Sequence, residues 1–129
     1  MTLILNKSDR ITETFIHWLE NEIKTRLIAY SDSKQLNRLS IYSKDVFNTQ
    51  LDLNAIYLDI VDSIKFKETA TSFILTFNYR GIINTNVIIK YINFGSSGVN
   101  GYPIFSKVFN DVMNNLDSYI YKYNLVGVL

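Results

Sequence analysis

The segment IKFKETATSFILTFNYR, residues 64–80, decides the fold that this chain is expected to adopt. Apolar and polar side chains alternate along both of its halves, which is the pattern of β-strands with one buried face. The apolar positions of that face are Ile64, Phe66, Phe73, Leu75, Phe77 and Tyr79. Polar and small residues at 68–71 separate the halves. The segment therefore predicts two antiparallel strands joined by a short turn.

A third strand is expected from the next apolar run, VIIKYINF, residues 87–94. Gly81 and two asparagines between residues 80 and 86 predict a turn before it. The run is rich in β-branched and aromatic residues, which favour strands. Both of its faces are largely apolar, so it predicts a central or covered strand of a small antiparallel sheet with three to four strands.

Helical periodicity is found on both sides of this sheet. Residues 8–30 begin with the good helix starters Ser8 and Asp9, and their apolar positions recur at helical spacing. These positions are Ile11, Phe15, Trp18, Leu19, Ile23, Leu27 and Tyr30. Residues 52–63 fit a short helix. Residues 31–51 are polar without a sustained period, so they predict a linker with a short helical or extended piece.

The last predicted helix covers residues 104–124, directly after Pro103. Its apolar stripe consists of Phe105, Val108, Phe109, Val112, Leu116, Tyr119, Ile120 and Tyr123. The tail 125–129 is apolar, and either folds back onto the core or adds to the sheet edge of a neighbour through Val126, Val128 and Leu129. The expected architecture is a single α+β domain of 129 residues with helices packed on one sheet face.

Composition excludes several classes of function. The chain has no cysteine, so disulfides, thiolate metal sites and cysteine nucleophiles are excluded. Its 13 basic and 12 acidic residues are interspersed, whereas nucleic-acid-binding modules usually carry a basic excess. No apolar run reaches the ~18 residues that a membrane span requires, and the N-terminus lacks a signal-peptide pattern, so a soluble protein is expected.

Catalytic and metal-binding chemistry is not expected either. The single histidine, His17, falls on the polar face of the first predicted helix, so it is interpreted as a solvated surface residue rather than a triad member. Asp59 and Asp62 lie three residues apart and could do acid–base work, but two solvated carboxylates are the simpler interpretation. The chain is therefore predicted to be no enzyme and to use no cofactor or metal.

The loop at residues 95–103 is the one serious site candidate. In YINFGSSGVNGYPIF, residues 91–105, Gly95, Gly98 and Gly101 stand between a predicted strand and a predicted helix, which is the setting of phosphate-binding loops. A P-loop, however, needs Lys and Ser or Thr after its last glycine, and Tyr102 and Pro103 stand there instead. A flexible, exposed connection between strand and helix is favoured over a phosphate cradle.

The flanks of this loop indicate another kind of site. Tyr91, Phe94 and Gly95 end an apolar run, and Pro103 and Phe105 open the last helix. This order resembles the tailed-bacteriophage tail-completion and head–tail joining proteins. Members of that family often carry an aromatic, a β-branched residue, Glu, an aromatic and Gly at the end of a strand, followed by a loop, Pro and Phe. The resemblance covers residues 53–123, with Asn93 in place of the usual acid.

The resemblance implies a structural virion protein at the head–tail junction, present in the host cytoplasm during assembly. It would form a ring of roughly six or twelve copies around the DNA channel, between portal-side and tail-side proteins. The implied assembly-contact loop consists of Gly95, Ser96, Ser97, Gly98, Val99, Asn100, Gly101 and Tyr102. Neck ring, tail terminator and tail-completion factor all stay open, as do two alternatives: a small nucleotide-binding enzyme that uses the glycine loop, and a nucleic-acid-binding adaptor.

Overall fold

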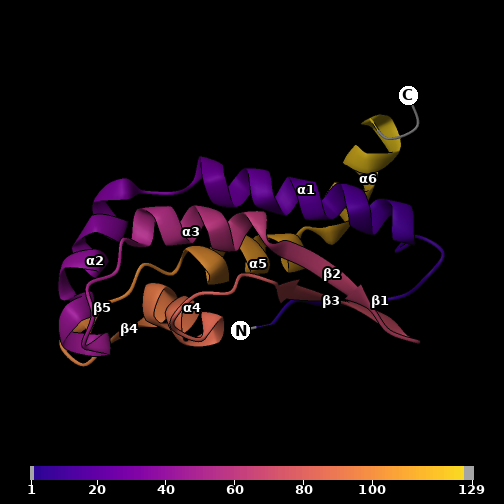
Figure 1. Ribbon diagram of the computed structural model, residues 1–129. Coiled ribbons are helices and arrows are strands. Elements are labelled where there is room, and N and C mark those ends of the chain that lie inside the picture. The colour runs from indigo at the N-terminus through magenta and orange to yellow at the C-terminus, as the bar shows by residue number, and fades with distance from the viewer. Residues whose placement is uncertain (1, 127–129) are drawn as a thin grey trace.

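The structure is a computed structural model that describes residues 2–126. Over this range the chain is α+β, with six helices, a three-stranded sheet and a two-stranded hairpin (Figure 1). In chain order the elements are β1 (Ile4–Asn6), α1 (Glu13–Ala29), α2 (Ser33–Phe47), α3 (Leu53–Asp62), β2 (Ile64–Glu68), β3 (Ser72–Phe77), α4 (Thr85–Phe94), β4 (Gly95–Ser96), β5 (Val99–Asn100), α5 (Ile104–Asn114) and α6 (Leu116–Val126).

The predicted pair of strands is confirmed. β2 and β3 pair antiparallel, with Ile64 opposite Phe77 and Phe66 opposite Leu75 on the core face. The turn between them is closed by Thr69, whose backbone N–H donates to the carbonyl of Ser72 at 2.8 Å. The order of the sheet is β1-β3-β2, so the hairpin supplies the central strand and one edge strand.

The predicted third strand is wrong. Residues 87–94 lie in helix α4, which begins after Asn84, whose side chain accepts the N–H of Asn86. The buried side chains of α4 follow helical spacing and face the core, namely Ile88, Ile89, Tyr91, Ile92 and Asn93. This burial outweighs the β-propensity of the run. The third strand of the sheet is instead β1, at the N-terminus, which pairs with β3.

The predicted linker is also wrong, because most of residues 31–51 form helix α2. Asp32 caps its start, accepting the N–H groups of Lys34 and Gln35, and Asn48 ends it in the left-handed conformation with φ 57°. The buried side of α2 carries Leu36, Leu39 and Ser43, which lie against α3 and neighbouring elements. The polar surface of α2 is therefore that of an amphipathic helix and not that of a linker.

Two helix boundaries differ from the expected ones. The first helix begins at Glu13 with Thr12 as its cap, and the hydroxyl of Ser8 accepts the N–H groups of Arg10 and Ile11 in the turn before it. The last helix is not continuous, because it breaks at Asn115 into α5 and α6. The short helix predicted at residues 52–63 is confirmed as α3.

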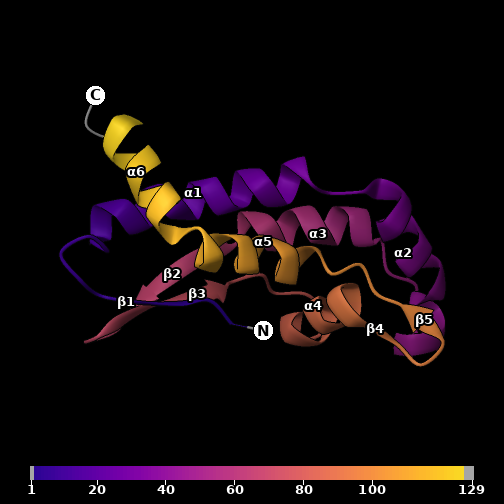
Figure 2. The same ribbon diagram turned by 180° about the vertical axis from the view of Figure 1, so that it is seen from behind.

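The helices pack on one face of the three-stranded sheet around a single apolar core. Phe105 of α5 is fully buried and its ring contacts those of Tyr57, Phe77 and Phe109. In both views α1 and α3 run side by side, α4 and the β4–β5 hairpin lie on the side of the molecule away from α1, and α6 crosses α1 (Figures 1 and 2). Between residues 2 and 126, no helix is long and apolar enough to cross a membrane.

Candidate functional site

The glycine loop folds as a small β-hairpin between two helices. β4 and β5 pair antiparallel, with Gly95 opposite Asn100 and Ser96 opposite Val99. Gly98, in the tight turn, has φ 77°, a conformation that favours glycine. The expected flexible connection from a strand to a helix is corrected in this respect: the loop follows helix α4 and has its own strand pairing.

Close packing fixes the hairpin against the end of α4. The N–H of Gly95 donates to the carbonyl of Tyr91, and the N–H of Tyr102 donates to the carbonyl of Ile92 at 2.6 Å. A Cβ atom on Gly95 would lie 2.0 Å from the carbonyl oxygen of Val99, and one on Gly101 would lie 2.6 Å from that of Asn93. Space therefore requires glycine at both ends of the hairpin, and the φ of 77° favours glycine at Gly95 as well.

Carbonyl oxygens of the hairpin face a positively charged side chain of α2. The guanidinium of Arg38 donates to the carbonyl of Asn100 at 2.6 Å and reaches that of Gly101 at 3.5 Å. Gln35, one turn earlier, holds the same guanidinium through two hydrogen bonds of 3.1 and 2.7 Å. A phosphate cradle needs free N–H groups, whereas this side of the hairpin offers acceptors that Arg38 already occupies.

Asn93 links the end of α4 to the start of α5. Its side chain is buried, its Oδ1 accepts the backbone N–H of Ser106 at 3.0 Å, and its Nδ2 donates to the hydroxyl of Ser106 at 2.6 Å. Ser106 lies in the first turn of α5, where the N–H groups lack partners inside the helix. Pro103, which precedes α5, makes no side-chain cap, so Asn93 supplies one from elsewhere in the chain.

This contact is a helix cap that comes from a residue outside the helix. A side-chain oxygen that accepts an N–H group of the first turn stabilises a helix N-terminus. Sequence reasoning missed this role, although Pro103 three residues before Ser106 marks the first turn that needs a cap.

The other motif residues divide into buried and exposed ones. Tyr91 is buried, donates its hydroxyl to the carbonyl of Leu39 at 2.6 Å, and packs edge-on against Phe47; burial raises the pKa of its phenol. Phe105 lies in the centre of the core. Phe94, by contrast, is 64% exposed at the last position of α4. The fold accounts for Tyr91 and Phe105 but gives Phe94 no internal partner ring among the described residues.

Tyr102, the last residue of the implied assembly-contact loop, is held by its own chain. Its hydroxyl donates to the carbonyl of Tyr30 at the end of α1, and burial raises its pKa. Ser96, Ser97 and Gly98 form the exposed tip of the hairpin. The hairpin therefore has a fixed base and an exposed tip.

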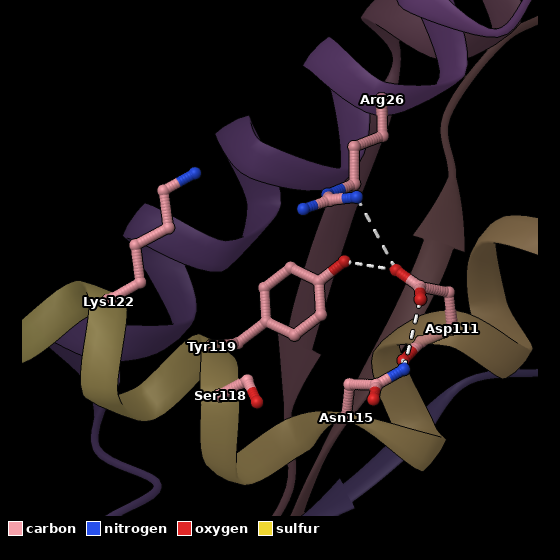
Figure 3. A pocket seen from close by; sticks show the side chains of 6 residues that line it. All are labelled: Arg26, Asp111, Asn115, Ser118, Tyr119 and Lys122. Atoms are coloured by element: carbon pink, nitrogen blue, oxygen red, sulfur yellow. Dashed lines mark hydrogen bonds and ion pairs between the residues drawn. The ribbon is translucent and has the colours of Figure 1, made fainter.

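A second group of polar side chains joins α1 to α5 and α6 (Figure 3). Asp111 accepts hydrogen bonds from the hydroxyl of Tyr119 and from the amide of Asn115, the latter at 3.0 Å, and forms an ion pair with Arg26 at 3.5 Å. The guanidinium of Arg26 also lies 4.9 Å from the centre of the Tyr119 ring. Burial and the hydrogen bond to Asp111 raise the pKa of Tyr119.

These contacts surround a hollow of about 290 Å³, which Ser118 and Lys122 also line. Lys122 forms an ion pair of 2.5 Å with Glu22 of α1. The group lies at the break between α5 and α6 and joins both helices to α1. Sequence reasoning did not find it, because its members come from three helices and share no motif.

The residues set aside as non-catalytic lie on the surface. His17 is exposed and its nearest acid is Glu13 at 3.7 Å. Asp59 and Asp62 are exposed on α3. Among residues 2–126 no group of three or more His, Asp or Glu side chains could hold a metal ion. Of the predicted tail contacts, Val126 is exposed at the end of α6, whereas Val128 and Leu129 lie outside the described residues.

No family model, curated protein or solved structure matches this chain. Its functional interpretation therefore depends on the residues and contacts described above.

Proposed function

We propose that this chain is a structural subunit of a ring at the head–tail junction of a tailed bacteriophage. In this role it is a neck, connector or tail-completion component between portal-side and tail-side proteins. The observation that carries the proposal is the junction of α4, the hairpin and α5. There Asn93 and Gly95 connect the two helices and Phe94 is left on the surface, although the resembling motif ends a strand and this segment ends a helix.

Exposed apolar side chains support a role in assembly. Large apolar side chains that are at least half exposed are Ile28, Ile41, Leu58, Ile82, Phe94, Tyr121, Leu125 and Val126. They occur on several elements, and Ile82 is 99% exposed. Where such side chains adjoin one another, as Leu58 with Ala55 on α3 and Val87 with Phe94 on α4 do at helical spacing, they form apolar surface that association can bury. A ring subunit needs two such surfaces, one for each neighbour.

The charge balance also fits this role. A net charge of +1 gives the ring no strong attraction for the phosphates of passing DNA, so the genome can slide through without being held. The proposed location is the virion, with the host cytoplasm as the place of assembly.

The two alternatives receive less support from the site. For a nucleotide-binding enzyme, the N–H groups of Gly95 and Tyr102 would have to face phosphate, but they donate to carbonyls of α4. For a nucleic-acid-binding adaptor, a basic surface would be needed, and of the basic side chains Lys7, Arg10, Arg26 and Lys122 form ion pairs with acids.

The proposal is tested by measuring the mass of the purified chain, alone and mixed with the proteins encoded beside it, together with negative-stain imaging. We expect closed rings in at least one of these mixtures. The variant Phe94→Ser should reduce ring formation, and Met113→Ser, which changes a half-exposed side chain of α5, serves as the control. Monomers in every mixture would refute the proposed function.

A further inference from the structure

Helix α3 has an outer face that is apolar and acidic. Ala55, Leu58, Asp59 and Asp62 are exposed and lie at helical spacing on this face, and Leu58 is 52% exposed. Neither carboxylate forms an ion pair or a side-chain hydrogen bond with any residue between 2 and 126. This acidic face, as we name it, consists of these four residues.

Helix α4 has an outer face that is apolar and basic. Val87, Lys90 and Phe94 lie at spacings of three and four residues, with Val87 46% and Phe94 64% exposed. Lys90 has no ion-pair partner within the described part of the chain. Val87, Lys90 and Phe94 form the basic face.

The two faces match in length and are opposite in charge. Residues 55–62 and residues 87–94 each cover seven residue steps, which is about 10 Å of helix. Each face presents apolar side chains beside its charges, so one face can bury apolar area against the other while the two carboxylates meet the ammonium of Lys90. Charge pairing of this kind selects the partner and fixes the register of a contact.

The faces lie at different places on the molecule. α3 runs beside α1, whereas α4 is on the side away from α1 (Figures 1 and 2). One copy can therefore use its acidic face while its basic face stays available to the next copy. A contact between two different surfaces of the same chain is heterologous, and it produces a closed ring when the rotation between copies closes.

We propose that the acidic face of α3 in one copy docks on the basic face of α4 in the next copy, and that this contact builds the ring. The inference rests on the proposed function for its choice of partner, a second copy of this chain. Phe94 and Leu58 supply its apolar centre, and Lys90 with Asp59 and Asp62 supplies its charge pairing.

The test is a charge-reversal cycle on the full chain, with self-association measured by sedimentation and by mass. Lys90→Glu and the pair Asp59→Lys with Asp62→Lys should each weaken association by at least ~10-fold, because like charges then meet. Combining all three changes should restore association to within about threefold of wild type. Lys67→Glu on the outer sheet face and Asp45→Lys on α2 reverse equally exposed charges and should leave association unchanged.

A second measurement guards against loss of folding. Phe94→Ser removes an exposed side chain, so the melting temperature should be unchanged while association is lost. All variants are measured alone and in the mixtures with neighbouring proteins.

Rings that form equally well with Lys90→Glu and with the α3 pair would overturn the inference and leave the proposed function standing. Effects of the control reversals as large as those of Lys90→Glu, or failure of the combined variant to recover, would also overturn it. A wild-type chain that joins purified phage particles as single copies would refute the ring and the contact together. A chain that joins no particle would refute the proposed function.

Discussion

The side chain of Asn93, at the end of α4, holds the backbone N–H of Ser106 in the first turn of α5 at 3.0 Å. This contact spans the whole glycine hairpin and ties the end of α4 to the first turn of α5.

Loss of this cap should destabilise the fold. Asn93→Ala removes the acceptor of a helix N-terminal N–H in a buried place, so the free energy of unfolding should fall by about 1–3 kcal/mol. Asn93→Asp keeps an oxygen acceptor and should cost less than Asn93→Ala. Urea unfolding measures both, with Asn110→Ala on the exposed side of α5 as the control. Equal stability of Asn93→Ala and wild type would show that the contact does not stabilise the junction.

The two glycines with positive φ should respond differently to alanine. Gly95→Ala places a Cβ atom 2.0 Å from the carbonyl oxygen of Val99, so the hairpin must move, whereas Gly98→Ala meets no atom within 4 Å. Gly98→Ala should lower the free energy of unfolding by only ~1–2 kcal/mol, because alanine disfavours the left-handed backbone conformation. Gly95→Ala should lower it by more. Urea unfolding ranks the two variants. The opposite ranking would contradict the packing of the hairpin against α4.

The direction of α6 should depend on Asp111. Asp111→Ala removes the acceptor for Tyr119 and Asn115 and the ion-pair partner of Arg26. We expect faster amide hydrogen exchange throughout α6, and unchanged exchange in α3, whose contacts do not involve Asp111. Asp117→Ala, which removes an exposed ion pair with Arg10, is the matched control. Unchanged exchange in α6 would show that the Asp111 contacts do not hold it.

Alkaline pH should weaken the same group of contacts. The pKa of Tyr119 is raised above its ordinary value of 10.0 by burial and by its hydrogen bond to Asp111. The folded state therefore favours the neutral phenol, and its contribution is complete below pH 10 and is lost as pH rises toward the folded-state pKa. Tyr57, also raised, contributes in the same direction.

The free energy of unfolding is measured from about pH 8 upward. The contribution of these two phenols to it should be constant up to about pH 10 and fall above that pH. Tyr119→Phe should reduce that fall. A variant with the same alkaline slope as wild type would show that Tyr119 does not titrate with a raised pKa.

Local sequence patterns predict those helices and strands in which apolar residues recur at regular spacing. Alternation in residues 64–80 identifies the β2–β3 hairpin because Lys65, Lys67 and Thr76 on its outer face alternate with apolar residues on its core face. Helix α2 was missed because its buried side includes Ser43, whose hydroxyl donates to the carbonyl of Ser40 and accepts the N–H of Leu51. A buried hydroxyl with two partners interrupts the apolar stripe without weakening the packing.

Other features depend on contacts that no local pattern contains. The run at residues 87–94 suits both strand and helix by composition, and burial of Ile88 and Ile92 against the core decides for the helix. The break at Asn115 has no proline or glycine; it lies beside Asp111, which Arg26 contacts from 85 residues away in sequence. The acidic face of α3 could be seen in part from Asp59 and Asp62, but its basic counterpart on α4 could not, because that run was predicted as a strand.

The central claim, that this chain builds a ring, is tested most directly by native mass measurement of the full-length protein mixed with its neighbouring connector and tail proteins. The account predicts a species with a fixed whole number of copies that appears as a closed ring in negative stain. A chain that stays monomeric at every concentration and in every mixture would contradict it.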